Sequence, residues 1–432
     1  MTRKTIVIAL ICMMVFTLAA CGSNKSGSSS NEPSTGGQTS ANAPAAGTDS
    51  EELKPEEGAE LVLWTIDNEA IQNTAKEFEA KYNVKVKVEN VMYWDSIARL
   101  TTDGPAGTGA DVMAFNHDAL GQAVKSGLVL PNDQFEEETK SNMTKQSIDA
   151  SSFEGTLYGY PFSVFTHALY LNKDLVKDAK LDSWDDIKAF AKQFNDIPNN
   201  KFGFMYEAGT MNYNYEWMSG NGGYVFGNNG TDKNDIGINN EGAVKGMEFF
   251  RSLKEILPLD LSDLTADVKN GLWEQGKVAI NMDGTWKATD YKKLPFEVGL
   301  IPLPAMPGGA EPLPFSGVTS FYVTAYTKYP NASRLLAHFL TTKESLLKHY
   351  EATGIIAPYA GFENEEKVQS DEIMQGFLKQ VANTQVMPNI PEMKYFWLSV
   401  DPVLTEVWNG ADIKTTLDKA AANMKASISS AK

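Results

Sequence analysis

The residue types that most often carry catalysis or metal binding are sparse in this chain and poorly spaced. The two cysteines, Cys12 and Cys21, lie near the N-terminus, and the four histidines are scattered with no His-x-x-x-His pair. We therefore expect no cysteine nucleophile, no zinc site and no disulfide framework in the folded part. The sequence also lacks a Gly-x-Ser-x-Gly nucleophile elbow. We expect neither a metal nor a cofactor.

The segment Gly271–Lys277 has the spacing of a phosphate-binding loop but not its chemistry. Val278 stands where that loop needs a serine or threonine hydroxyl for Mg²⁺. Trp273 would crowd a phosphate group in the loop, and Glu274 would repel it. The segment instead predicts a helix that ends at Gly276 and a strand that starts at Val278.

Aromatic and carboxylate side chains are the stronger chemical signal. A neutral oligosaccharide presents an apolar C–H face and a rim of hydroxyl groups, so it suits flat aromatic rings flanked by carboxylates and amides. Trp286 follows a predicted strand and the turn Asp283–Thr285, and strand ends are where α/β proteins build ligand sites. Asp67 and Asn68 close the first predicted strand, where the alternative role is to cap the next helix.

The N-terminus has the features of an export signal. Arg3 and Lys4 precede Ile6–Leu18, an apolar run too short to span a bilayer comfortably but suited to a signal-peptide core. Small residues then lead into Cys21, a pattern that resembles the bacterial lipoprotein signal. Cleavage there would remove residues 1–20 and leave Cys21 as a lipidated first residue. The alternative is a buried apolar helix that happens to end in a cysteine.

Composition and charge extend this interpretation. Residues 21–58 are rich in Ser, Gly, Ala, Asn, Pro and Thr, and they predict a disordered tether because they can bury little apolar surface. The net charge of −17 over 432 residues disfavours a nucleic-acid partner. We expect a protein on the extracellular face of the cytoplasmic membrane, on a Gram-positive surface. The lipid on Cys21 would be its only contact with the membrane.

From residue 59 onward, buried strands alternate with amphipathic helices. Glu60–Ile66 predicts a strand, Ile71–Tyr82 a helix with one apolar face, and Ala110–Phe115 another strand. This alternation predicts an α/β protein with mostly parallel sheets flanked by helices. The length of 432 residues suits two or three globular units or one large bilobal body.

Short segments spread over this body carry a family resemblance. They are Leu63-Trp64, Gly104-Pro105, Asp111-Val112, Ser126–Leu128, Gly155–Pro161, Leu171–Leu175, Asn221–Tyr224, Gly237–Ala243, Gly276–Trp286, Phe315–Val318 and Met387–Met393 with Phe396-Trp397. In this order and spacing they resemble the extracellular solute-binding proteins of carbohydrate ABC importers, and most of all the maltose/maltodextrin-binding proteins. The resemblance covers nearly all of the body.

The resemblance implies a two-lobed periplasmic-binding-protein-like fold with the ligand cleft between the lobes. Lobe one would comprise residues 59–163 and 317–352, and lobe two residues 168–315 and 356–432. Hinge closure would capture a malto-oligosaccharide, such as a linear maltodextrin or a cyclodextrin. A monomeric, non-enzymatic receptor of this kind delivers its ligand to the permease subunits of an ABC importer.

Three alternatives stay open at this stage. The same fold could bind a galacto- or xylo-oligosaccharide, since aromatic rings and carboxylates suit any of these sugars. The 55 acidic residues also leave room for a surface glycosidase with paired carboxylates. A structural, adhesin-like lipoprotein would bind no small ligand saturably.

The resemblance also implies which residues bind the ligand. They are Asp67, Asn68, Phe115, Asp118, Phe165, Tyr213, Trp286 and Trp397. Phe115 stands where maltose-binding proteins often carry a tryptophan, and Phe165 where they carry a glutamate. The second exchange suggests a longer, flatter or less polar ligand, unless Phe165 simply packs at the hinge.

Overall fold

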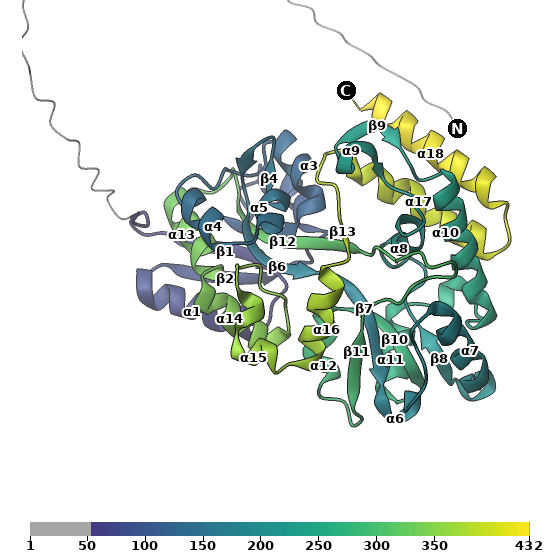
Figure 1. Ribbon diagram of the computed structural model, residues 1–432. Coiled ribbons are helices and arrows are strands. Elements are labelled where there is room, and N and C mark those ends of the chain that lie inside the picture. The colour runs from purple at the N-terminus through teal and green to yellow at the C-terminus, as the bar shows by residue number, and fades with distance from the viewer. Residues whose placement is uncertain (1–52, 432) are drawn as a thin grey trace, which may run out of the picture. The chain divides into compact units, whose positions relative to one another are not determined.

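The computed structural model describes residues 53–431. These residues belong to one compact unit built around two β-sheets (Figure 1). None of the helices in this range is long and apolar enough to cross a membrane. The expected signal peptide (1–20), the lipidated Cys21 and residues 22–52 of the expected tether lie outside the described residues.

The first sheet has six strands. Five of them follow the order β13–β12–β3–β1–β2, and the sixth, β6, also pairs with β12. The strands are β1 (Glu60–Thr65), β2 (Lys85–Asn90), β3 (Val112–Asn116), β6 (Tyr160–Phe165), β12 (Phe315–Val323) and β13 (Gln385–Val386). β1 is parallel to β2 and β3, whereas β12 is antiparallel to β3 and β6. Residues that follow β1, β2 and β3 therefore meet at one edge of the sheet.

The second sheet has four strands in the order β11–β7–β10–β8. The strands are β7 (His167–Asn172), β8 (Phe202–Met205), β10 (Val278–Gly284) and β11 (Val298–Ile301). β7 is antiparallel to β10 and β11, and only β8 and β10 are parallel. The prediction of a mostly parallel sheet is wrong here. The chain comes from β6 directly into β7, so β7 starts at the edge where β10 ends.

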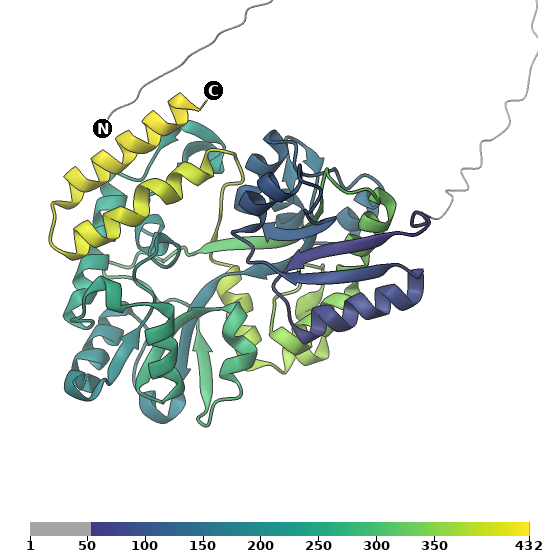
Figure 2. The ribbon, with the colours of Figure 1, turned by 180° about the vertical axis from the view of Figure 1, so that it is seen from behind.

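Helices flank both sheets, as Figures 1 and 2 show from opposite sides. Those associated with the first sheet are α1 (Glu69–Tyr82), α2 (Ser96–Asp103), α3 (Leu120–Lys125), α4 (Glu136–Asn142), α5 (Lys145–Ala150), α13 (Pro330–Leu340) and α14 (Lys343–Thr353). The others are α6 (Lys173–Val176), α7 (Trp184–Phe194), α8 (Tyr215–Ser219), α9 (Gly227–Gly230), α10 (Glu241–Ser252), α11 (Ala266–Glu274), α12 (Ala288–Tyr291), α15 (Glu366–Gln369), α16 (Glu372–Val381), α17 (Met393–Trp408) and α18 (Ile413–Ser430).

The remaining strands are short. β4 (Ser152–Phe153) pairs with β5 (Thr156–Leu157), and β9 (Asp232–Ile236) follows α9. α11 ends at Glu274 and β10 begins at Val278, with Gly276 between them at a φ of 66°. This confirms the helix–strand interpretation of Gly271–Val278 to within two residues, since only a glycine adopts this left-handed turn without strain.

One of the links between the two sheets is very short. Only Thr166 separates β6 of the first sheet from β7 of the second. The Thr166 hydroxyl donates to the Phe315 carbonyl oxygen at 2.9 Å, where β12 begins. The Thr285 N–H, just after β10, donates to the Thr166 carbonyl oxygen at 3.2 Å. This one residue therefore joins β12 to the end of β10.

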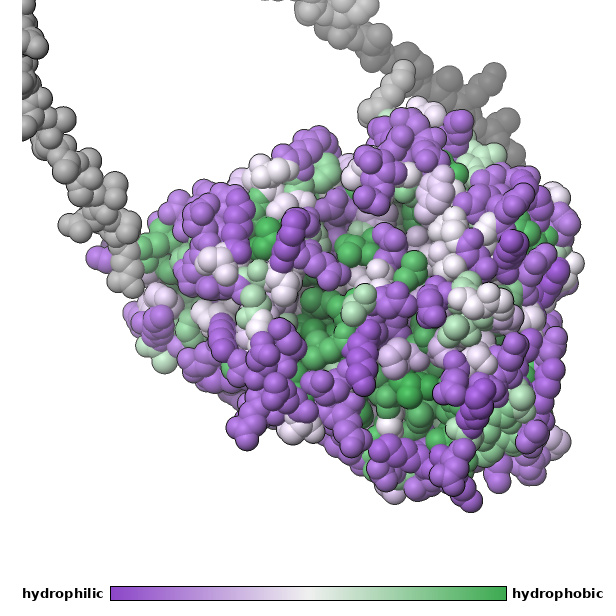
Figure 3. Space-filling model, in the orientation of Figure 1, coloured by the Kyte–Doolittle hydropathy of each residue, from purple (hydrophilic) through white to green (hydrophobic). Residues whose placement is uncertain are grey.

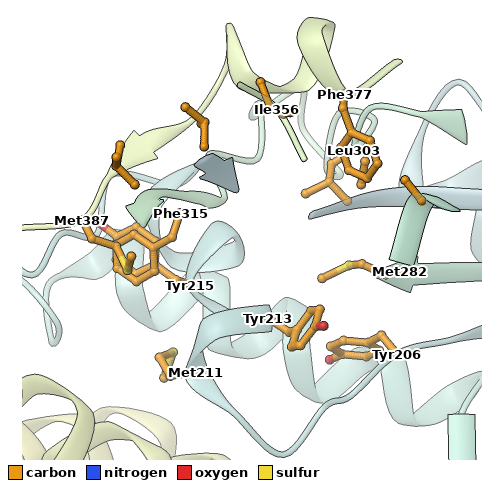
Figure 4. Packing of buried hydrophobic residues seen from close by; sticks show 14 of the residues in the cluster. Tyr206, Met211, Tyr213, Tyr215, Met282, Leu303, Phe315, Ile356, Phe377 and Met387 are labelled. Carbon is orange, nitrogen blue, oxygen red and sulfur yellow. The ribbon is translucent and has the colours of Figure 1, made fainter. Parts of the chain in front are cut away.

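A later segment belongs to a different sheet from the one expected. Gln385 of β13 pairs with Phe315 of β12, and the Gly121 N–H donates to the Asn389 carbonyl oxygen at 2.9 Å. Residues 385–389 therefore lie against the first sheet, although the expected second lobe included all of 356–432. Figure 4 shows the result in side chains, with Met387 next to Phe315 and Tyr215.

The folded unit also includes residues that were assigned to the tether. Leu53 packs against the main hydrophobic core. The Glu56 carboxylate accepts hydrogen bonds from the Asn331 N–H at 2.8 Å and the Ala332 N–H at 3.0 Å. These are first-turn donors of α13, whose N-cap residue Tyr329 has no side-chain acceptor. The expected tether boundary at residue 58 is therefore too late.

Replacing Glu56 with alanine should lower the free energy of unfolding by about 1 kcal/mol, because two N–H groups of α13 lose their acceptor. Urea unfolding followed by circular dichroism measures this loss. Glu57→Ala is the matched control, since the Glu57 side chain is exposed. Equal losses in the two variants would contradict a capping role for Glu56.

Candidate functional site

The edge of the first sheet carries a buried histidine that fixes the local backbone. His117 follows β3, and its Nδ1 accepts a hydrogen bond from the Val318 N–H at 3.1 Å. Its Nε2 therefore carries the proton and donates to the Met387 carbonyl oxygen at 2.9 Å. Burial lowers the pKa of His117 to about 4, so the ring is neutral at pH 7. This histidine attaches segment 385–389 to β12.

Asp118 and Trp397, two predicted site residues far apart in sequence, are brought together beside this histidine. The Trp397 Nε1–H donates to Asp118 Oδ2 at 3.1 Å, and both side chains are half-buried. Burial raises the pKa of Asp118 to about 6, although the hydrogen bond from Trp397 opposes this shift. The carboxylate and the indole therefore form a single unit at the strand edge.

The Trp397 ring lies on α17 and packs edge-on against Phe315 of β12, with ring centroids 5.7 Å apart. Its other aromatic neighbour is Phe396, at 4.9 Å. The Asp401 carboxylate, one turn further along α17, accepts from the Met211 N–H at 3.0 Å. α17 is thus connected both to β12 and to the loop that contains Tyr213.

The second group of predicted residues gathers at the end of β10. Trp286 is 44% exposed, and its indole lies over Gly284, where a Cβ would come within 2.2 Å of the ring. Phe165 and Tyr213 each contact the Trp286 ring edge-on, at centroid distances of 6.4 Å. Tyr213 is only 5% exposed, so it supports Trp286 and does not offer a free face of its own.

A buried polar network holds Tyr213 in this position. Asp283 accepts hydrogen bonds from the Tyr213 hydroxyl at 3.2 Å and from the Tyr291 hydroxyl at 2.6 Å. It also pairs with the buried Lys269 ammonium group. Burial lowers the pKa of Lys269, and the charge of Asp283 opposes that shift. The network places the Tyr213 ring against Trp286 and keeps both charges paired.

The two groups lie on the same side of β12. Phe315, which contacts Trp397, and Gly317 are two residues apart and so share one face of the strand. The Phe165 ring covers Gly317, where a Cβ would come within 2.0 Å of the ring. Phe165 in turn contacts Trp286. Figure 3 shows apolar side chains reaching the surface over β6 and β12 and, further on, over the second sheet.

Two of the expected ligand residues have other roles. Phe115 is fully buried and stacks on Tyr322 of β12 at a centroid distance of 3.8 Å, so the prediction that Phe115 contacts the ligand is wrong. It points to the side of the sheet that packs on a second hydrophobic cluster. Asn68 is the N-cap of α1, because its Oδ1 accepts from the Ile71 N–H at 3.0 Å. Here the alternative interpretation is confirmed.

Asp67 remains exposed, with one carboxylate oxygen bound by the Gln72 side chain at 2.8 Å. Glu207, which follows β8 at the same edge as Trp286, was not predicted as a site residue. Glu207 is half-buried, and burial raises its pKa while the charge of Lys269 lowers it. It forms no hydrogen bond through its side chain within residues 53–431. Its position just after a buried strand run is the signal that could have identified it.

The part of the chain that the structure describes shows no cluster of metal-binding side chains. Within residues 53–431 there is no group of three or more His, Cys, Asp or Glu side chains placed to hold a metal ion. The polar groups near the two tryptophans are instead carboxylates and hydroxyls next to aromatic rings. This combination suits hydrogen bonding to a neutral, hydroxylated ligand.

Two sheets joined at Thr166, with aromatic residues at their edges, define a two-lobed ligand-binding fold. A cyclo/maltodextrin-binding protein complexed with maltotetraose shares it with a TM-score of 0.75 and 33% identity, covering 86% of this chain and 98% of that one. Residues 73–376 match the family described as bacterial extracellular solute-binding protein, and the chain belongs to that family.

Two curated relatives extend the comparison. The galactooligosaccharide-binding protein of Bacillus subtilis strain 168 is 31% identical over 99% of this chain and 98% of its own length. A protein of Streptococcus pneumoniae strain R6, named as a maltooligosaccharide ABC transporter solute-binding lipoprotein, is 29% identical over 83% of this chain and 86% of its own.

The raised pKa of Asp118 makes a prediction about stability and pH. Because its folded pKa of about 6 exceeds the ordinary value of 3.8, its ionisation opposes folding. Its contribution to stability is therefore complete below pH 3.8 and is lost as pH rises through about 6. The free energy of unfolding of Asp118→Asn, relative to wild type, should rise between pH 4 and pH 7 in urea titrations. A pH-independent difference would contradict the raised pKa.

The network at Asp283 makes a second prediction. Tyr213→Phe should increase acrylamide quenching of Trp286 in the ligand-free protein and lower the free energy of unfolding by about 1 kcal/mol. The quenching of Trp286 is the difference between each protein and the same protein that also carries Trp286→Phe. Tyr291→Phe removes a hydroxyl from the same carboxylate but does not contact Trp286, so it should leave this quenching unchanged. Equal quenching in the two variants would show that Tyr213 does not position the indole.

Proposed function

We propose that this chain is an extracellular receptor for malto-oligosaccharides, which it binds between Trp286 and Trp397. The observation that carries this proposal is the pair of accessible indoles on the same side of β12, each with a carboxylate nearby. Asp118 bonds to Trp397, and Glu207 follows β8 at the sheet edge where Trp286 follows β10. Aromatic faces would hold the C–H faces of the sugar, and the carboxylates would accept its hydroxyl protons.

The proposed mechanism is binding by hinge closure, with no bond cleavage. Because one link between the sheets is the single residue Thr166, a bend there would move one wall toward the other. A sugar that contacts both walls favours the closed form. To invert the populations of an open-dominated protein, it must bind the closed form about 10²–10⁴ times better.

The lipid anchor, the localisation and the partners are part of the same proposal. Cys21 would carry the lipid on the outer face of a Gram-positive cytoplasmic membrane, and a monomer would deliver the sugar to ABC-importer permease subunits. The Streptococcus pneumoniae relative is named as an ABC transporter solute-binding lipoprotein, which supports this assignment. If it is correct, Cys21→Ala should release the protein from the membrane fraction, and retention there would argue against the anchor.

A galacto-oligosaccharide is the second candidate ligand. The Bacillus subtilis galactooligosaccharide-binding protein is similar over almost the whole of both chains, which favours this candidate. Phe165 stands where the maltose-binding pattern has a glutamate, and this departure from the pattern also favours a sugar other than maltodextrin.

Titration of the protein with maltotriose should give a saturable change in tryptophan fluorescence. Trp286→Ala and Trp397→Ala should each weaken binding by about 2 kcal/mol, or roughly 30-fold, because each removes a stacking face. Leu398→Ala is the matched control, since Leu398 is 74% exposed and adjacent to Trp397. Chromatography of the samples should recover intact maltotriose, and solution scattering should show compaction at saturation.

The outcomes separate the candidates. No response to maltotriose but a saturable response to galactotriose would transfer the proposal to the second sugar. Shorter products would identify an enzyme. No response to either sugar would overturn the oligosaccharide proposal and leave only the fold and the family.

A further inference from the structure

Trp94 is an exposed tryptophan in the loop between β2 and α2. Its side chain is 71% exposed, more than that of any other aromatic residue in the range 53–431. Tryptophan combines a large apolar face with a polar N–H group, so an exposed indole on an ordered loop suits contact with a ligand. Trp94 has no role in the site between Trp286 and Trp397 described above.

The loop that carries Trp94 runs along the edge of the first sheet where β1 and β3 end. The Val91 N–H donates to the Thr65 carbonyl oxygen, the last of β1, at 3.0 Å. The Ser96 hydroxyl donates to the Ala114 carbonyl oxygen of β3 at 2.9 Å. Trp94 lies two residues before Ser96, so the Cα atoms of these two residues are within about 7 Å of each other. The exposed indole therefore belongs to the edge that also carries Asp118.

Hydrogen bonds hold this loop in one conformation. The Asp95 N–H donates to the Met92 carbonyl oxygen at 2.9 Å, and the Ser96 hydroxyl lies 3.3 Å from the same oxygen. Tyr93 packs against the main hydrophobic core, which leaves Met92 and Trp94 on either side of it at the surface. A ligand that binds Trp94 therefore does not have to order the loop first.

Carboxylates accompany Trp94 at this edge. Asp95 is the N-cap residue of α2, yet its exposed side chain caps no N–H group of the helix. Asp67, also exposed, follows β1 at the same edge. An indole with a neighbouring carboxylate is the combination already seen in the contact of Trp397 with Asp118. It suits a neutral sugar, whose C–H face lies on the indole and whose hydroxyl groups donate to the carboxylate.

Tyr326, the other exposed aromatic residue associated with the first sheet, has a different environment. It is 40% exposed and follows β12, which is antiparallel to β3. It therefore lies at the edge opposite the one that carries Trp94. The Tyr326 ring covers Gly104, where a Cβ would come within 2.4 Å of the ring. Tyr326 thus packs on the backbone of its own lobe, and it provides a matched control for Trp94.

The place of Trp94 along the edge relates it to the length of the ligand. In the first sheet β3 lies next to β12, and β1 and β2 follow further out. Trp397 and Asp118 are associated with β12 and β3, whereas the loop of Trp94 starts from β2 and crosses the end of β1. A ligand held by Trp397 and Asp118 reaches Trp94 by extending outward along this edge, which requires additional sugar units.

We propose that Trp94 and Asp95 form an outer subsite, which binds an additional unit of a neutral oligosaccharide and makes the protein prefer long chains to short ones. The C–H face of that unit lies on the Trp94 indole, and the Asp95 carboxylate accepts its hydroxyl protons. On this wall the subsite supplies the aromatic face that the buried Phe115 does not offer. It extends the site of the function proposed above and rests on that proposal.

Calorimetric titration with maltotriose and maltohexaose tests the outer subsite in the whole folded protein. Trp94→Ala should weaken the binding of maltohexaose about tenfold, because a stacking face is lost, and that of maltotriose less than twofold. Trp94→Phe keeps a flat ring and should recover most of the affinity for maltohexaose. Tyr326→Ala, the matched control, should leave the affinities for both sugars unchanged. Galactotriose and galactohexaose replace these sugars if the wild type responds only to the galacto series.

Acrylamide quenching reports whether the sugar covers the Trp94 ring. The quenching of Trp94 is the difference between each protein and the same protein that also carries Trp94→Phe. Saturating maltohexaose should reduce this quenching, and saturating maltotriose should leave it unchanged. A role of Trp94 in holding the loop alone would not produce this difference between the two sugars.

The outcomes separate this proposal from the one on which it rests. A wild type that binds both sugars, with Trp94→Ala weakening both equally or neither, would overturn the outer subsite and leave the site between Trp286 and Trp397 intact. Unchanged quenching of Trp94 by saturating maltohexaose would also overturn it and leave the indole for another partner. A wild type that binds no sugar of either series would overturn both proposals. Circular dichroism melting of each variant confirms that it is folded.

Discussion

The candidate site depends on the first three residues of β12. The Phe315 carbonyl oxygen accepts a hydrogen bond from the Thr166 hydroxyl, and the Phe315 ring contacts Trp397. Gly317 leaves room for the Phe165 ring, and Phe165 contacts Trp286. A single strand end thereby sets the relative position of two indoles that belong to different parts of the chain. The link through Thr166 is only one residue long, so a bend there would move each indole together with its own wall.

Buried polar groups support this strand end from both sides. The neutral His117 ring joins the backbone of β12 to that of segment 385–389. The Asp283–Lys269 pair lies beneath Tyr213 at the end of β10. Polar groups of this kind are costly to bury unless every partner is present, so they specify one local geometry more strictly than apolar contacts do. The aromatic walls are positioned by polar contacts that a ligand would not touch.

The sequence predicted those residues of the site that follow a recognisable local pattern or lie in a segment that resembles a known family. Trp286 was recognisable because a turn follows a run of buried residues, and Trp397 and Asp118 because their surroundings resemble a family. The prediction for Phe115 was wrong because a residue at a strand end can point to either face of the sheet. Its packing on Tyr322 decides which face it takes. The antiparallel direction of β7 could not be predicted either, because the alternation of strands and helices does not show whether neighbouring strands are parallel. Asp283 and Lys269 are fourteen positions apart, and no local pattern marks them as a pair.

The glycines beneath two of the rings have an evolutionary consequence. Trp286 lies over Gly284 and Phe165 lies over Gly317, so each ring rests on bare backbone. A different side chain at position 286 or 165 would therefore meet a flat peptide surface and not a tailored socket. Sugar preference can drift in a lineage by exchanging a single ring, without any compensating change in the core. The glycines themselves are the constrained positions, because any side chain there would displace a ring.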